Sequence, residues 1–379
     1  MLIIKNRSHL PPETGSSPRV AMPFLNYEPN WTRMEELAQK YNFIKRIILV
    51  GNGGSINTFR AIYPVLAANS TPEVAFVDTN DPEVLESVAQ KSDPAKTLLL
   101  SISKSGENAS QLEATLYFYQ IPNKAFITGP KGALREISKI DAQIDLIDHP
   151  DIGGRFAGLS EVGLFPALLC GFNAKNLVVQ PSDETLEAAW QLASFIYGSE
   201  QEEKTELLVS NYAASFSGFS LFIQQLFHET FAKKGKGVTV IPVDSPESHH
   251  HTNQRIFGGR QNMSVLFLKP KVEQTLLSIP SNLLGVKFKD KTLRDFEDLD
   301  LAGSFEAEYS GVKERADELK IPNLTLEIQG SAEKEVGEYV RFWQLAAVYG
   351  AHLRGVDPFD QPDVENSKEI SFKKRFRVR

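Results

Sequence analysis

The sequence Arg-Ile-Ile-Leu-Val-Gly-Asn-Gly-Gly-Ser at residues 46–55 is the clearest indication of the fold class. Residues 46–50 form a short, largely β-branched run that ends in glycine, which is typical of a strand buried on both faces. A glycine-rich turn follows, and the spacing of residues 55–68 predicts a helix directly after it. A strand, a tight turn and a helix in this order form the opening unit of an α/β fold.

The same alternation continues to about residue 150. Further strands are predicted at 74–78, 97–103, 124–128 and 142–147, with helices beginning near residues 82, 108 and 133. Strands joined by helices imply a parallel sheet that is covered on both faces and connected by right-handed crossovers. We therefore predict a first doubly wound α/β domain over residues 31–150.

A second α/β domain is predicted over residues 151–355. Its strands are expected at 206–209, 238–243, 264–268 and 324–328, and its helices at about 183–198, 216–233, 304–320 and 332–353. Residues 269–303 have no clear period and are left unassigned. The proline-rich residues 1–30 predict an extended N-terminal arm, and Pro358 and Pro362 are expected to end regular structure ahead of a basic C-terminal tail, 356–379.

Composition excludes several classes of protein. The 379 residues carry a formal net charge of −7, which offers no overall attraction to nucleic acid or to an anionic membrane. One cysteine rules out an internal disulfide framework and cysteine-rich zinc sites, and Cys170 itself is expected to be buried and inert. No apolar run approaches the ~18 residues of a membrane span, so we expect a cytoplasmic protein.

The first candidate site is the turn that contains Gly53, Gly54 and Ser55. Ligands of open parallel sheets bind beyond the carboxyl ends of the strands, and glycines at a helix N-terminus let backbone N–H groups reach an anion. A dinucleotide site with Asp78 as ribose ligand is a rival interpretation, but Ile56 occupies the third glycine position. Phosphate or phosphosugar binding is favoured, and a plain tight turn stays open.

The second candidate site follows the strand predicted at 97–103. Ser103, Lys104 and Ser105 bring hydroxyls and a cation to the start of the next helix, which is again suited to an anion. Ser105 could alternatively serve only as a helix N-cap. Since both loops follow parallel strands, we expect them at the same edge of one sheet.

Charged and imidazole side chains give two further candidates. Arg155 is flanked by glycines in an apolar stretch, where either an anionic ligand or a salt bridge to Asp151 or Glu161 would offset the cost of burial. Glu229 shares a helix face with apolar residues, which suits a carboxylate to proton transfer. The run at residues 249–251 is three consecutive histidines, for which a polar loop with one inward ring is the simple alternative. His9, His228 and His352 are assigned to the arm, to packing or to the surface.

Taken in order, the motifs resemble the glucose-6-phosphate isomerase family from about Ile47 to Lys368. They are Gly-Asn-Gly-Gly-Ser, Ser-Lys-Ser-Gly, Gly-Gly-Arg-Phe-x-x-Leu-Ser, Gln-Leu-x-x-Glu, Pro-x-x-x-His and Pro-Phe-Asp-Gln-Pro-x-Val-Glu-x-x-Lys. The resemblance implies two flavodoxin-like sugar-isomerase (SIS) domains. It also implies an aldose–ketose isomerisation that uses no metal and no cofactor and passes through a cis-enediol.

The resemblance also implies residue roles. Glu229 would be the base, Arg155 would stabilise the enediolate, and His250 and Lys368 would assist ring opening, with His249 as the alternative to His250. In the family this histidine comes from a partner subunit, which implies a homodimer. The residues expected at the substrate phosphate are Gly53, Gly54, Ser55, Ser103, Lys104, Ser105 and Asn108.

Departures from the family pattern leave alternatives open. Glu107 and Asn108 stand where the family usually offers threonines, which places a negative charge close to the expected phosphate. On composition alone, Lys368 would belong to a solvated basic tail. The other functions considered are an isomerase that also accepts mannose 6-phosphate, a weakly catalytic phosphosugar-binding protein, and an NAD-dependent dehydrogenase.

Overall fold

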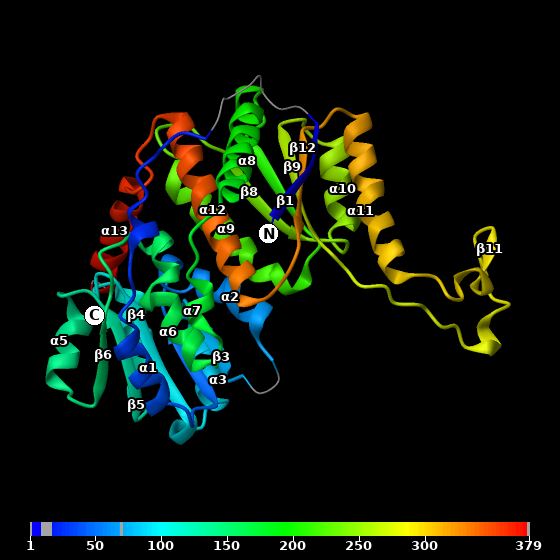
Figure 1. Cartoon of the computed structure of the whole chain (residues 1–379). Helices are drawn as coiled ribbons and strands as arrows, with labels where there is room; N and C mark the ends of the chain where they lie inside the picture. Colours follow the sequence, from blue (N-terminus) through cyan, green and yellow to red (C-terminus); the bar gives the residue numbers. More distant parts are fainter. Residues whose placement is uncertain (1, 9–16, 69–70, 377–379) are drawn as a thin grey trace.

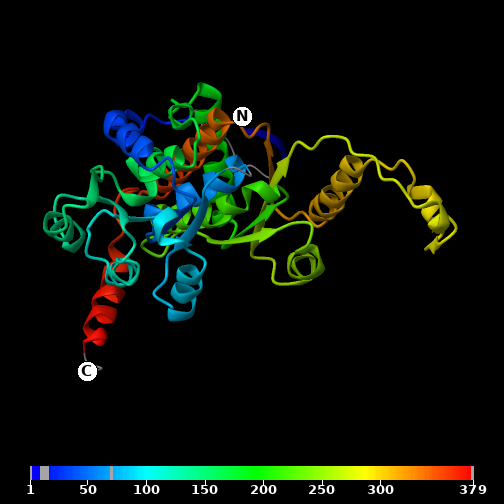
Figure 2. The same cartoon turned by 90° about the horizontal axis from the view of Figure 1, so that it is seen from below.

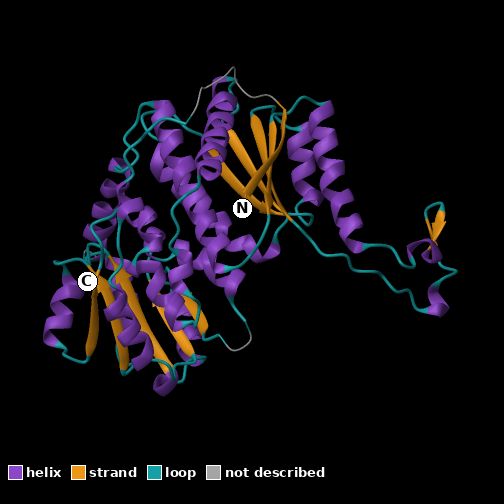
Figure 3. Cartoon of the chain, viewed as in Figure 1, coloured by secondary structure: helices purple, strands orange, loops and turns teal. Residues whose placement is uncertain are grey.

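A computed structural model describes residues 2–8, 17–68 and 71–376 of the chain, which contains two separate five-stranded sheets (Figures 1 and 3). The first sheet has the order β3-β2-β4-β5-β6, and all its strands are parallel. The strands are β2 (Arg46–Val50), β3 (Glu73–Val77), β4 (Thr97–Ser103), β5 (Asn123–Thr128) and β6 (Ile144–Asp148). This confirms the predicted doubly wound sheet.

The chain reverses its direction of winding between β2 and β4. From β2 it moves to β3 on one side, and then returns to β4 on the other side. The crevice at such a switch point is where ligands of open α/β sheets bind. The loops after β2 and β4 therefore lie side by side at the carboxyl edge, as predicted.

The second sheet has the order β1-β12-β9-β7-β8. Its strands are β7 (Glu206–Asn211), β8 (Thr239–Asp244), β9 (Met263–Pro270), β12 (Asn323–Ile328) and β1 (Leu2–Ser8). Four of them are parallel, and β1 adds an antiparallel edge strand beside β12. Part of the predicted arm thus completes a sheet, whereas residues 9–16, with His9, lie outside the described residues.

Helices cover both sheets and fill the space between them (Figure 1). They are α1 (Trp31–Lys40), α2 (Asn57–Leu66), α3 (Pro82–Gln90), α4 (Ala109–Tyr117), α5 (Ala133–Ile140), α6 (Glu161–Leu169), α7 (Ala174–Leu177), α8 (Asp183–Gln201), α9 (Ser217–Phe231), α10 (His249–Gly258), α11 (Leu301–Glu318), α12 (Glu333–Arg354) and α13 (Glu365–Arg375). Most of α12 is buried, and one hydrophobic core runs from the first sheet through α12 to the second. The division of the chain near residue 150 therefore stays a prediction.

Helix α2 lies directly against α9, and this contact joins the two sheets. A Cβ atom at Gly218 would lie 2.3 Å from the backbone oxygen of Arg60, so only glycine permits the approach. The contact brings the start of α2, next to the glycine-rich turn, close to the helix that carries Glu229.

Two segments differ from the sequence expectations. The histidine run opens helix α10 and does not form a surface loop. The prediction of an irregular C-terminal tail was wrong, because residues 365–375 form helix α13. Pro362 stands in the first position of a short 3-10 turn ahead of this helix, where proline starts regular structure and does not end it.

The unassigned segment projects away from the body of the molecule between β9 and α11 (Figures 1 and 2). It contains only a small hairpin, β10 (Lys287–Phe288) and β11 (Lys291–Thr292), besides short 3-10 turns. Among the described helices, none is long and apolar enough to cross a membrane.

Candidate active site

Arg155 and Glu229 meet between the two sheets. Arg155 lies in a 3-10 turn, Gly154–Leu159, and Glu229 lies in the last turn of α9. Arg155 Nη1 is 3.4 Å from Glu229 Oε2, and the two side chains are 2% and 26% exposed. The alternative salt bridges are not formed, since Asp151 pairs with Lys104 and Glu161 accepts hydrogen bonds from Tyr27 and Asn30.

The guanidinium of Arg155 is held on every side. Its Nε donates to Thr230 Oγ1 at 3.0 Å, and Nη1 donates to Gln361 Oε1 at 2.7 Å. Nη2 donates to the backbone oxygens of Pro358 and Asp360 at 2.5 and 2.9 Å. Burial lowers the pKa of Arg155, and the carboxylate of Glu229 acts in the opposite direction. Because guanidinium keeps its proton in proteins, the site holds a fixed cation.

Lys233 also binds the C-terminal segment 357–361, which contacts Arg155. Its Nζ donates to the backbone oxygens of Asp357 and Asp360 at 2.5 and 2.6 Å, and to Asp360 Oδ1 at 2.6 Å. The hydrogen bond from Lys233 also holds the pKa of Asp360 below its usual range. Sequence reasoning had not assigned Thr230, Lys233 or Gln361 to the site, although the Pro-Phe-Asp-Gln-Pro motif already singled out the segment.

The second carboxylate oxygen of Glu229 faces Gln225, one helical turn earlier. Gln225 Nε2 donates to Glu229 Oε1 at 2.9 Å. Gly53 has a φ of +53°, and a Cβ there would lie 2.7 Å from Gln225 Nε2. A Cβ at Gly54 would lie 2.2 Å from the carbonyl carbon of Gly154. The glycine-rich turn after β2 thus lies against the backbone of Arg155 and against Gln225, the hydrogen-bond partner of Glu229.

The loop after β4 turns its polar groups toward its own backbone. Ser103 is buried and its Oγ accepts from the backbone N–H of Gly106 at 3.2 Å. Ser105 Oγ accepts from the backbone N–H of Glu107 at 3.2 Å, and Asn108 is the N-cap of α4. Ser105 is therefore not the helix cap. Ser55 is half-buried on the neighbouring turn.

Glu107 lies toward β5 and away from the turn after β2. A Cβ at Gly132 in the loop after β5 would meet Glu107 Cγ at 3.1 Å. The Glu107 side chain therefore begins beside the loop after β5, which lies on the opposite side of β4 from β2.

The two candidate histidines have different surroundings. His249 has both ring nitrogens engaged: Nε2 is 2.7 Å from the hydroxyl of Tyr212, and Nδ1 is 3.5 Å from Glu308 Oε2. Burial lowers the pKa of His249. His250 is exposed, and both histidines line a hollow of about 450 Å³ between α10 and α11.

Neither His250 nor Lys368 reaches the Arg155–Glu229 pair within one chain. Lys368 Nζ lies 2.7 Å from Glu365 Oε1 and the side chain is 51% exposed. Across residues 2–8, 17–68 and 71–376, no hydrogen bond or ion pair links either residue to that pair.

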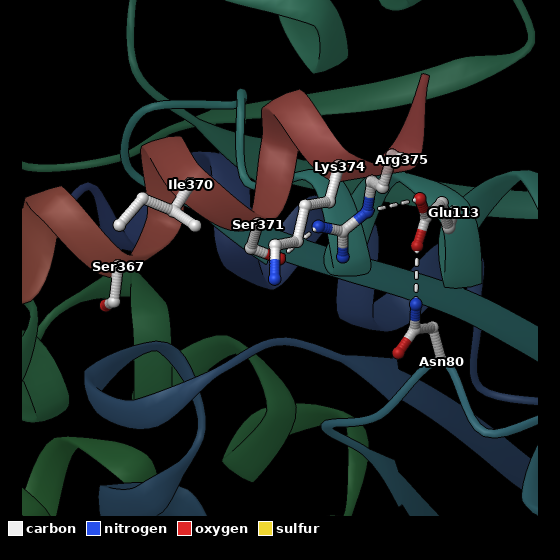
Figure 4. A pocket seen from close by; sticks show the side chains of 7 residues that line it. All are labelled: Asn80, Glu113, Ser367, Ile370, Ser371, Lys374 and Arg375. Atoms are coloured by element: carbon white, nitrogen blue, oxygen red, sulfur yellow. Dashed lines mark hydrogen bonds and ion pairs between the residues drawn. The ribbon is translucent and has the colours of Figure 1, made fainter. Parts of the chain in front are cut away.

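Helix α13 lies beside the end of the first sheet. Figure 4 shows Arg375 pointing toward Glu113 of α4, which in turn contacts Asn80; the distances are 2.7 and 2.6 Å. A hollow of about 590 Å³ separates α13 from these groups, lined also by Ser367, Ile370, Ser371 and Lys374. The helix that carries Lys368 is thus attached to the helix that Asn108 caps. Within the described residues, no group of three or more His, Cys, Asp or Glu side chains could hold a metal ion.

Two doubly wound units, each built around a largely parallel sheet, match the two flavodoxin-like domains of the SIS fold class. Solved structures agree with this fold. A hypothetical protein of Thermus thermophilus superposes with a TM-score of 0.77 at 20% identity, covering 93% of this chain and 91% of its own. A glucose-6-phosphate isomerase of Chlamydia trachomatis gives 0.70 at 16% identity, covering 92% and 73%.

Similar curated sequences share one name, glucose-6-phosphate isomerase. The chain is 27% identical to a glucose-6-phosphate isomerase of Mycoplasma mobile, over 91% of this chain and 87% of that protein. It is also 27% identical to a glucose-6-phosphate isomerase of Staphylococcus aureus, over 86% and 79%. No family model matches the chain.

Proposed function

We propose that this protein interconverts D-glucose 6-phosphate and D-fructose 6-phosphate through a cis-enediolate. The observation that carries the proposal is the pairing of buried Arg155 with Glu229 beside a glycine-rich turn. Homologues named glucose-6-phosphate isomerase support a sugar-phosphate isomerase role.

In this proposal Glu229 moves the proton between C1 and C2. A carboxylate in a largely apolar helix can take a proton from one carbon and return it to the next. Arg155 places a fixed cation at the oxygens on which negative charge develops, and its tight hydrogen bonding removes the need to reorganise during the reaction. Segment 357–361 covers the guanidinium and limits the access of water.

The phosphate is proposed to bind in the crevice between the loops after β2 and β4. In this proposal, backbone N–H groups and hydroxyls of the two loops would turn to the phosphate, together with the ammonium group of Lys104. The residues are Gly53, Gly54, Ser55, Ser103, Lys104, Ser105 and Asn108. Lys104 would exchange Asp151 for the phosphate.

Ring opening is proposed to need a second copy of the chain. His250 is exposed and lies on α10, whereas both ring nitrogens of His249 are already engaged. We therefore propose that His250 acts in the site of a partner subunit in a homodimer. Lys368 would leave Glu365 when substrate binds.

The test is an isomerase assay with fructose 6-phosphate, coupled to an added glucose-6-phosphate dehydrogenase, with EDTA present. NADPH should form with the native protein and with Glu314→Gln, an exposed change on α11, but not with Glu229→Gln. Normal turnover in Glu229→Gln would show that another group is the base. Absence of turnover in the native protein, with fructose 6-phosphate still raising its melting temperature, would favour a phosphosugar-binding protein.

A further inference from the structure

We propose that Arg60 and Asn57 of α2 are positioning residues that set the orientation of the Gln225 amide toward Glu229. The inference rests on the proposed function, because it concerns the base of that reaction. It adds two residues to which none of the motifs above assigns a role.

The four side chains form a single line of hydrogen bonds. Arg60 Nη1 donates to Asn57 Oδ1 at 3.3 Å, and Asn57 Nδ2 donates to Gln225 Oε1 at 2.8 Å. Gln225 Nε2 then donates to Glu229 Oε1 at 2.9 Å. The line of hydrogen bonds crosses from α2, which follows β2 of the first sheet, to α9, which follows β7 of the second sheet.

The direction of the line follows from its first member. The two ends of an amide group are nearly equal in shape, so packing alone does not decide which end faces a neighbour. A guanidinium can only donate, which turns the oxygen of Asn57 toward Arg60 and its nitrogen toward Gln225. The oxygen of Gln225 then faces Asn57, and an N–H is left for Glu229.

Arg60 is itself held in place. Its Nη2 donates to Asp78 Oδ2 at 2.8 Å, and its guanidinium lies 5.0 Å from the ring centre of Phe76. Asn57 is 9% exposed, so little water competes for its amide. The close approach at Gly218 keeps the backbone of Arg60 against α9. The beginning and the end of the line are therefore fixed relative to each other.

The consequence for the reaction concerns the two oxygens of Glu229. Among the described residues, Oε1 accepts a hydrogen bond of 2.9 Å from Gln225, whereas the contact of Oε2 is the longer one of 3.4 Å to Arg155. The geometry points to Oε2 as the oxygen that takes the proton from substrate carbon and returns it. A reversed Gln225 would set its carbonyl oxygen against Oε1, which favours the protonated carboxyl group.

The variant Asn57→Asp tests this, because it exchanges one nitrogen for oxygen with little change of shape; it also adds a negative charge, which Arg60 beside it offsets. An aspartate at this position accepts from both neighbours, so Gln225 should rotate and present its carbonyl oxygen to Glu229. We expect kcat to fall roughly tenfold with little change in KM, and the acid limb of the pH–rate profile to move to higher pH. A kcat within twofold of the native value and an unmoved acid limb, in a folded variant, would overturn the proposal.

Changes at Arg60 provide a second test if Asn57→Asp does not fold. Arg60→Lys keeps a cationic donor and should retain the native pH profile, whereas Arg60→Met removes the donor and should move the acid limb in the same direction as Asn57→Asp. Equal profiles for the lysine and methionine variants would contradict the proposal.

A readout that needs no turnover separates this inference from the proposed function. The ¹³C resonance of the Glu229 carboxyl, identified by its loss in Glu229→Gln, should titrate at higher pH in Asn57→Asp than in the native protein. If the native protein shows no isomerase activity but this difference is present, the proposed function fails and the positioning role stands. An unchanged titration would overturn the positioning role whatever the activity.

Discussion

A Cβ atom at Gly54 would lie 2.4 Å from the backbone nitrogen of Arg155. The turn after β2 and the 3-10 turn that carries the arginine are thus in backbone contact, and the position of the guanidinium depends on this contact. The same turn touches Gln225 through Gly53. The glycine-rich turn, Arg155 and Gln225 therefore form one packed unit.

The first prediction concerns this contact. Gly54→Ala should lower the free energy of unfolding by about 1–3 kcal/mol, because the new methyl group meets backbone atoms that cannot move aside independently. Activity should fall as well, since the turn with Arg155 is displaced. Denaturant unfolding and the coupled assay measure the two effects.

Gly153→Ala is the matched control for Gly54→Ala. A Cβ there meets nothing within 4 Å, and the backbone has a negative φ of −58° that alanine adopts without strain. Its unfolding free energy should stay within about 0.5 kcal/mol of the native value. Equal losses in both variants would show that the loop contact is not the cause.

The second prediction concerns Arg155. Arg155→Lys keeps the charge but cannot reproduce the contacts to Thr230, Gln361 and the backbone of segment 357–361. We expect kcat to fall roughly 10²–10³-fold, because a cation that is no longer fixed stabilises the developing negative charge poorly. Steady-state kinetics measure this. A kcat within tenfold of the native value would show that charge alone is sufficient.

The third prediction tests whether His250 acts across a subunit interface. His250→Ala and Glu229→Gln should each be inactive alone. When equal amounts are mixed and the subunits exchange, half of the dimers are mixed, and one of their two sites carries both native residues. We therefore expect about a quarter of the native activity to return. If His250 acts within its own chain, every site carries one of the two substitutions and no activity returns.

The fourth prediction concerns pH and the buried His149. Burial lowers the pKa of His149 from 6.5 to about 4, and its Nδ1 lies 2.8 Å from the backbone oxygen of Pro150. The unfolded chain therefore binds a proton more readily than the folded one. The stability linked to this group is complete above pH 6.5 and is lost as the pH falls toward 4.

Between pH 7 and pH 5 this linkage should remove about 2 kcal/mol of the free energy of unfolding. His149→Gln cannot take up the proton, so its stability should depend less steeply on pH over this range. The matched change at an exposed histidine, His352→Gln, should leave the slope as it is in the native protein. Urea unfolding at several pH values measures all three. Equal slopes for the native protein and His149→Gln would show that His149 does not titrate in this way.

Much of the fold could be read from local patterns. The β-branched run at residues 46–50 and the leucine-rich run at 97–103 are typical of buried parallel strands, and both strands were found where predicted. The tail was misjudged because α13 has no buried face to impose a period on its sequence, and Pro362 resembled a stop signal. The edge strand β1 could not be recognised because its partner, β12, lies more than 300 residues away.

Local patterns were sufficient to predict the two α/β units, the glycine-rich turns and the candidates Arg155 and Glu229, because local periodicity, backbone freedom and motif order are properties of neighbouring residues. Which of these groups meet became visible in the folded chain. It paired Arg155 with Glu229 and not with Asp151 or Glu161, brought Gln361 across from the C-terminal segment, and connected Arg60 through Asn57 to Gln225. It also left His250 and Lys368 apart from the pair within one chain. The physical reason is that a buried charge pairs with the group that tertiary packing places beside it. The separation of two residues along the sequence does not show whether packing brings them together.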